Sequence, residues 1–197
     1  MSQSTLKNGV ITPDIVHYQT VCFLQATKLV QSIQSMKDVL LLQFDLHQRL
    51  YNNVLDGFTD EETNRRPHGD RNMNHVKYLA GHLLNSRYGL TSMTWFSPEV
   101  KWNDLFAVMG QSEAKDDIPY PSIEEIKKEW NILYEPTRKE LEKLTADSLA
   151  KTPLAPFDKV AESKGKLWAF INHHQAYHIG QISILRKAFA KKPMSYE

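Results

Sequence analysis

Two histidines four residues apart are the side chains of this chain best suited to chemistry. His174 and His178 lie in a segment whose apolar residues, including Ile171 and Ile182, recur at helical spacing. Residues four apart stack on one face of a helix, so both imidazoles would point to the same place. Burying two unpaired imidazoles among apolar groups is costly unless something satisfies them. From spacing alone, a divalent metal site and a pair of hydrogen-bonded core histidines both remain open.

A catalytic zinc-type site has three protein ligands and an open position, so a metal here requires a third ligand from elsewhere. His82 is the best candidate, because apolar residues at helical spacing surround it. His75 is its rival, two turns earlier on nearly the same face. Its place in the first turn of the helix favours a solvent-facing position, and we therefore prefer His82.

The segments around these histidines resemble the DinB-like family of four-helix-bundle metalloproteins. The resemblance spans about residues 32 to 190. The matching pieces are, in order, Leu55-Asp56-Gly57-Phe58-Thr59-Asp60-Glu61-Glu62, Arg65-Arg66-Pro67, Gly81-His82-Leu83, Leu144-Thr145-Ala146-Asp147, and His174 and His178 followed by Gly180-Gln181. It implies that His82, His174 and His178 are the metal ligands, and that the helices follow an up-down-down-up topology.

Two residues beside the ligand pair need separate interpretation. Family members often carry an acidic residue directly after the first histidine of the pair, whereas this chain has Gln175. An amide can donate and accept hydrogen bonds but cannot compensate the charge of a cation. His173 lies about 100° from His174 around a helix, so both cannot bind one ion without distortion. We interpret His173 as a helix-surface residue or a neighbour of the ligands.

Composition predicts one soluble domain. The 197 residues are 41% hydrophobic, and Lys plus Arg (24) nearly balance Asp plus Glu (23). The basic residues form no stripe, which argues against nucleic-acid binding. No apolar run approaches the ~20 residues that span a bilayer. The single Cys22 and a polar N-terminus indicate a cytoplasmic protein without an internal disulfide.

Four long amphipathic patterns predict helices. The first ends near Asp56-Gly57, and the second follows Asn74 as N-cap and stops before Ser97-Pro98. Ser122 and Glu125 predict a capping box for the third, which Pro136 should kink or interrupt. The fourth runs from about Ser163 to about Ala190.

We therefore predict an all-α four-helix bundle over residues 31–192, preceded by an N-terminal extension over residues 1–30. The long connection from about Phe96 to Pro121 fits a crossover between parallel neighbours. Trp102, Leu105, Phe106 and Met109 in that connection, with the loop from Thr152 to Ser163, would form the lip of the site or cover the end of the bundle.

Three neutral imidazoles leave a divalent ion its Lewis acidity and open positions for water, a thiol or a substrate oxygen. His47, on the inward stripe of the first helix, is the candidate catalytic base, and a core histidine is the alternative. Asn85 and Gln181, each three residues after a ligand, are candidates to orient bound water, whereas packing is the preferred role for Tyr177.

We expect one divalent metal ion, zinc or nickel in preference to iron or manganese, since imidazole suits several of these metals. The resemblance implies a metal-dependent enzyme, a hydrolase or a transferase that uses a low-molecular-weight thiol and a small-molecule substrate. The alternative is a non-catalytic metal-binding bundle for storage, sensing or assembly. We expect a homodimer from the fold class, and neither nucleic acid nor membrane as a partner.

Overall fold

A computed structural model describes residues 28, 36–69, 72–94, 96–106 and 113–196. The chain divides into two compact units, residues 1–36 and 37–197. The expected N-terminal extension, with Cys22, lies outside the described residues apart from Lys28, and so does Met109. The extension and its boundary at residue 31 therefore stay predictions, and the description below concerns the second unit.

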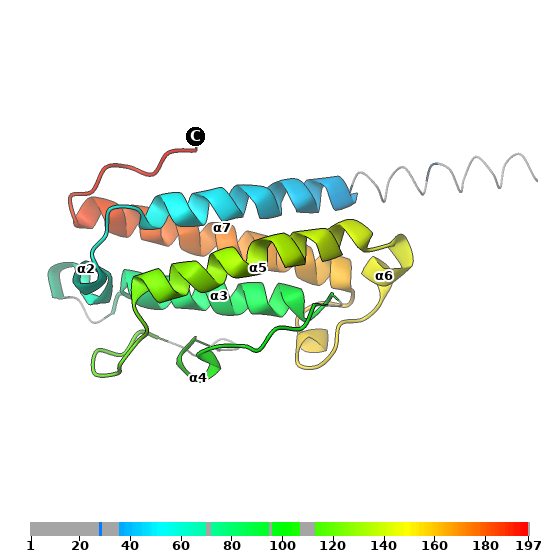
Figure 1. Ribbon diagram of the computed structural model, residues 1–197, viewed down its shortest axis with the longest axis horizontal. Coiled ribbons are helices and arrows are strands. Elements are labelled where there is room, and N and C mark those ends of the chain that lie inside the picture. Colours follow the sequence, from blue (N-terminus) through cyan, green and yellow to red (C-terminus); the bar gives the residue numbers. More distant parts are fainter. Residues whose placement is uncertain (1–27, 29–35, 70–71, 95, 107–112, 197) are drawn as a thin grey trace, which may run out of the picture. The chain divides into compact units, whose positions relative to one another are not determined.

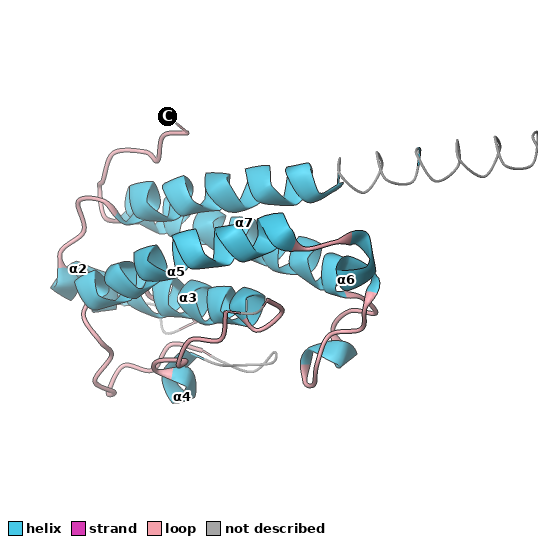
Figure 2. Ribbon diagram, turned by 45° about the vertical axis from the view of Figure 1, so that its right-hand side comes forward, coloured by secondary structure: helices cyan, strands magenta, loops and turns pink. Residues whose placement is uncertain are grey.

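Helices make up the second unit, and no strand occurs in the described ranges. Figure 1 shows the long helices lying side by side, and Figure 2 shows loops as the remaining described structure. The long helices are residues 37–55, α3 (Val76–Thr91), α5 (Ile123–Lys143) and α7 (Lys164–Ala188), and the short ones are α2 (Asp60–Asn64), α4 (Asn103–Phe106) and α6 (Ala146–Ala150). This architecture confirms the all-α prediction.

Contacts along the helices give their relative directions. The Leu40 carbonyl accepts a hydrogen bond from Asn172, and the Val54 carbonyl accepts one from Arg186, so helix 37–55 and α7 run the same way. α3 and α7 run in opposite directions, because Lys164 at the start of α7 donates to a carbonyl just beyond the end of α3. This antiparallel pairing brings the middle of α3 beside the middle of α7.

α3 and α5 also run the same way. The Asp60 carboxylate contacts both Lys77 Nζ and the backbone N–H of Ile123, each near the start of its helix, at 2.8 and 2.7 Å. Farther along, Tyr88 donates to Glu129. Parallel neighbours need a connection long enough to return to the first end of the bundle. The connection between α3 and α5, which contains α4, meets that need.

Most of the predicted helix ends are confirmed. The first helix ends at residue 55, and Gly57 takes the left-handed conformation (φ 73°) that favours glycine. Ser122 and Glu125 form the predicted capping box of α5, and Ser163 caps α7. These signals are local, so the sequence reveals them directly.

The prediction for the start of α3 needs correction, whereas the prediction that it stops before Ser97-Pro98 is confirmed. His75, not Asn74, is the N-cap: its Nδ1 accepts from the Tyr78 N–H at 3.0 Å. The Asn74 side chain instead accepts from the backbone N–H of Ala114. α3 ends at Thr91, before Ser97-Pro98, where successive hydroxyl groups (Thr91, Ser92 and Thr94) bond to carbonyls three residues back and compete with the helix.

Pro136 does not interrupt α5, contrary to one of the two outcomes expected for it. Proline removes the hydrogen bond to the carbonyl four residues earlier, which belongs to Ile132. The Ile132 side chain is exposed, so this carbonyl lies on the side of α5 that water reaches. The inward stripe of the helix and its C-cap are buried throughout (Ile123, Ile126, Trp130, Leu133, Thr137, Leu141 and Leu144).

An unusual cation lies inside the bundle. The Arg87 guanidinium of α3 is fully buried, 3.2 Å from the centre of the Trp130 ring and 4.6 Å from that of Phe44. It donates to the Gln48 side chain and to the Trp130 carbonyl. Aromatic faces stabilise such a desolvated cation, and here they link three long helices through one side chain.

Within the described residues, no helix has both the length and the apolar character needed to cross a membrane.

Candidate metal centre

Three histidines from two helices converge at one point. His82 of α3 meets His174 and His178 of α7, and one ring nitrogen of each lies within 4.8 Å of the others. The Nε2 atom of His174 is 3.0 Å from Nε2 of His82 and 3.0 Å from Nε2 of His178. All three side chains are partly buried. The antiparallel packing of α3 on α7 thus joins residues far apart in the sequence.

Hydrogen bonds to the opposite ring nitrogens determine two of the tautomers. His82 Nδ1 lies 3.2 Å from the backbone carbonyl oxygen of Phe106, which can only accept, so this nitrogen carries the proton. His178 Nδ1 lies 2.7 Å from Gln181 Oε1 and donates to it in the same way. Both rings therefore direct an unprotonated Nε2 at His174.

The three nitrogens cannot satisfy one another. A neutral His174 can present at most one N–H on Nε2, whereas two lone pairs, from His82 and His178, face that atom. A cation at the point of convergence would accept all three lone pairs, and histidines that bind metals characteristically donate their other N–H to a carbonyl or carboxylate. The donor set therefore fits a divalent metal ion.

Burial keeps these imidazoles neutral. The pKa of His174 is lowered to about 3, first by desolvation and then by the electrostatic effect of His178, His82 and His173. Desolvation also lowers the pKa of His82 and His178, although their hydrogen bonds to Phe106 and Gln181 act in the opposite direction. Neutral imidazole is the form that binds metal, so the site is ready for a cation at neutral pH.

Gly81 is essential to the packing behind His82. A Cβ atom at this position would lie 2.2 Å from the Phe106 ring, much closer than real contacts allow. The missing side chain lets the buried Phe106 pack on α3 and brings its carbonyl to His82. Sequence reasoning placed Phe106 at the lip of the site or over the bundle end and missed this role. Gly81, directly before His82 in the sequence, was the available signal.

A family model described as the DinB superfamily matches residues 43–182, well over half of the chain and including all three histidines. The chain belongs to the DinB superfamily. No curated protein matches it. Membership in this superfamily and the three-histidine cluster together fit a metal-binding protein.

The shorter motifs of this DinB-superfamily protein are structural. Thr59 caps α2 in a capping box with Glu62, and Asp60 next to it joins α2 to α3 and α5. Thr145 caps α6. These residues stabilise the ends of the helices and so help to place α3 against α7, but none of them contributes a ligand atom to the histidine cluster.

The residues next to the clustered histidines differ in whether they contact them. Gln181 accepts a hydrogen bond from His178, whereas Asn85, at the equivalent position after His82, donates to Asn103 of α4. His173 is exposed, in agreement with a helix-surface position. Gln175 is fully buried and its amide faces Ser86 of α3, so it packs between the two helices.

Two further histidines, His75 and His47, are buried. His75 is completely buried rather than solvent-facing, because it caps α3 and packs against Tyr120; its pKa is lowered to about 4, first by burial. His47 is 5% exposed, and burial followed by the charge of Arg87 lowers its pKa to about 4. Within the described part of the chain, no hydrogen bond or ring contact joins His47 to the cluster, so its role as a base stays a prediction.

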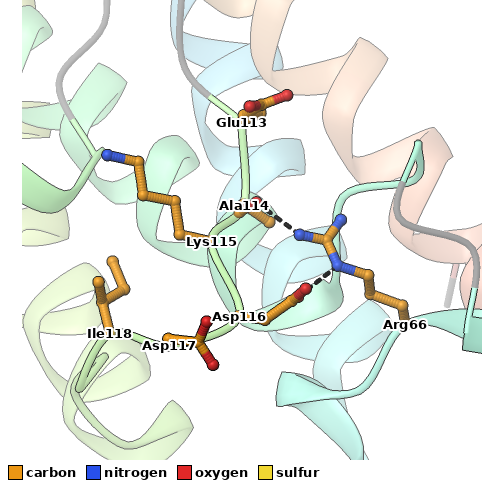
Figure 3. Close-up of a pocket in the computed structure, with 7 residues that line it drawn as sticks. All are labelled: Arg66, Glu113, Ala114, Lys115, Asp116, Asp117 and Ile118. Atoms are coloured by element: carbon orange, nitrogen blue, oxygen red, sulfur yellow. Dashed lines mark hydrogen bonds and ion pairs between the residues drawn. The ribbon is translucent and has the colours of Figure 1, made fainter.

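A separate surface pocket is lined by Arg66 and by residues 113–118, as Figure 3 shows. Arg66 donates to the Asp116 carboxylate at 2.5 Å and to the Ala114 carbonyl at 2.5 Å, and it also bonds to the Met73 carbonyl. The guanidinium thus attaches this loop to the segment before α3. None of the three clustered histidines lines the pocket, and we assign it a structural role.

Proposed function

We propose that this DinB-superfamily protein is a metal-dependent enzyme that activates a small thiol, or water, for attack on a small electrophile. The observation that carries the proposal is the convergence of three Nε2 atoms, two of which are held as lone-pair donors by Phe106 and Gln181. A divalent metal bound there would supply Lewis acidity and lower the pKa of a coordinated thiol or water.

The chain's own residues would control that chemistry. Three neutral imidazoles add no negative charge to the ion, so its attraction for an anionic nucleophile is preserved. The hydrogen bonds from His82 and His178 hold their rings in the ligating tautomer and orientation. The partial exposure of the three side chains leaves room for a substrate to approach from solvent.

A thiol is our preferred nucleophile, because the site offers little help in removing a proton from water. Among the described residues, no carboxylate forms a hydrogen bond or ion pair with the three histidines. A thiol bound to a cation loses its proton near neutral pH without a neighbouring base. The same observation favours a second candidate function, a metal-binding protein that performs no catalysis.

Metal analysis tests the site. We expect about one zinc or nickel ion per chain in the wild type and loss of the metal when His174 and His178 are both replaced by alanine. His82→Ala should lower the affinity by at least about tenfold, and His75→Ala should preserve the affinity of the folded protein. Full metal content in the double variant would place the site elsewhere.

Measurement of catalytic turnover tests the proposed thiol-dependent reaction. The metal-loaded protein should transform model electrophiles in the presence of a low-molecular-weight thiol and lose this activity on chelation. Thiol-independent ester or amide hydrolysis that disappears in His174→Ala would establish water as the nucleophile instead. Tight metal binding without turnover across a broad panel would favour the non-catalytic candidate.

A further inference from the structure

The three ligand rings differ in what covers them. The Tyr78 ring stacks on His82 with ring centres 5.9 Å apart and planes within 10°, and Tyr78 is buried. Phe170 stacks on His174 (6.3 Å, 21°), and Tyr177 packs edge-on against His178 (5.1 Å, 73°). These two aromatic residues are 49% and 59% exposed. The His82 side of the cluster is therefore covered by protein, whereas the α7 side carries aromatic rings in contact with solvent.

Phe170 and Tyr177 belong to one stripe of α7. They are seven residues apart, which is two helical turns, and Ile184, 65% exposed, continues the stripe after another seven. An isolated apolar residue on a surface needs no explanation. Here two large aromatic rings on the same stripe each contact a different histidine ring, so the exposed apolar surface borders His174 and His178, which are themselves partly exposed.

We propose that Phe170 and Tyr177 form a platform that binds the flat apolar part of the substrate while its polar end lies at the metal. The substrate class is then a small molecule with an aryl or similarly planar apolar group next to a metal-binding polar group. Offset and edge-on ring contacts favour such a group over an aliphatic one of equal polarity. The inference rests on the proposed function, because the polar end needs an open metal position.

A matched pair of metal-binding probes tests this platform. Acetohydroxamate and benzohydroxamate share the same chelating group and differ by a methyl and a phenyl substituent. Titration calorimetry on the zinc-loaded full chain should show about tenfold tighter binding of benzohydroxamate. In Phe170→Ala and Tyr177→Ala the preference should fall to about twofold or less, whereas the dissociation constant of acetohydroxamate and the zinc content should stay at wild-type values.

Two variants control for less specific effects. Tyr177→Phe keeps the ring and should keep the preference for benzohydroxamate. Ile184→Ala removes an exposed side chain from the same stripe, six residues beyond His178, and it should also keep the preference. An equal loss in Ile184→Ala would identify the stripe as a general apolar surface and overturn the platform.

The possible results distinguish failure of the platform from failure of the proposed metal-dependent function. Equal affinity of the two hydroxamates in the wild type would overturn the platform and leave the open metal position intact. Failure of both hydroxamates to bind the zinc-loaded protein would show that the metal has no open position, and this would contradict the proposed function as well. Loss of zinc in Phe170→Ala would show that the ring supports the ligand and does not bind substrate.

Discussion

One amide group determines what His178 presents to the cluster. Gln181 Oε1 accepts the Nδ1 proton, so the Nε2 lone pair remains available. Asn85 stands in the equivalent position three residues after His82, yet it bonds to Asn103, and His82 is oriented by a backbone carbonyl instead. His82 and His178 thus reach the same tautomer through different acceptors.

Gln181→Leu should weaken metal binding by about tenfold or more, because His178 would lose the acceptor that keeps its proton on Nδ1. Competition with a chromophoric chelator would measure the dissociation constant. Gln181→Glu keeps an acceptor and should bind metal at least as tightly as the wild type. Asn85→Leu is the positional control and should leave the affinity unchanged; a similar loss there would mean that the effect is not transmitted through His178.

Two glycines of the family motifs lie within helices, but only one of them is required by packing. Gly81 in α3 leaves space that the Phe106 ring fills. Gly180 in α7 is exposed, and a Cβ atom there would meet nothing within 4 Å. Glycine within a helix costs stability relative to alanine, so only the first of these positions has a packing reason for it.

Gly81→Ala should lower the free energy of unfolding by about 1–3 kcal/mol, because the methyl group must displace a buried ring. It should also weaken metal binding, since the Phe106 carbonyl moves away from His82. Gly180→Ala should raise the free energy of unfolding by about 0.5–1 kcal/mol and leave metal binding intact. Denaturant titration and metal competition of both variants would check this; equal behaviour of the two glycines would contradict it.

Burial of uncharged histidines couples the stability of the whole molecule to pH. His47 and His75 each have a pKa lowered to about 4, from an ordinary value of 6.5. Between these values the unfolded chain takes up a proton at each residue and the folded chain does not. Unfolding therefore consumes protons, and the free energy of unfolding must fall as the pH drops from about 6.5 to about 4.

His47→Gln should make this decline shallower by up to about 1.4 kcal/mol per pH unit. Denaturant unfolding of the metal-free protein, measured in chelator between pH 7 and pH 4.5, would give the slope. His68→Asn is a suitable control, because His68 is exposed and its positive φ of 54° suits asparagine. An unchanged slope in His47→Gln would mean that His47 is not buried as an uncharged core residue.

The helices and one half of the site could be predicted from the sequence, because both depend on contacts within a few residues. The caps at Ser122 and Ser163 and the turn at Gly57 are local signals. The pairing of His174 with His178 follows from the helical repeat alone. We preferred His82 to His75 as the third histidine because of the apolar residues around it and the family resemblance. The structure places His82 beside His174 and His178.

The acceptor that orients His82, and the burial of His75, were decided only by tertiary structure. Phe106 reaches His82 from 24 residues away, through a ring that fits over Gly81. We expected His75 in a solvent-facing first turn, yet it is the N-cap of α3 and the packing of Tyr120 covers it. Periodicity shows which face of a helix is apolar, but it does not show which distant backbone group will lie against that face, since this depends on how the helices and their connections pack together.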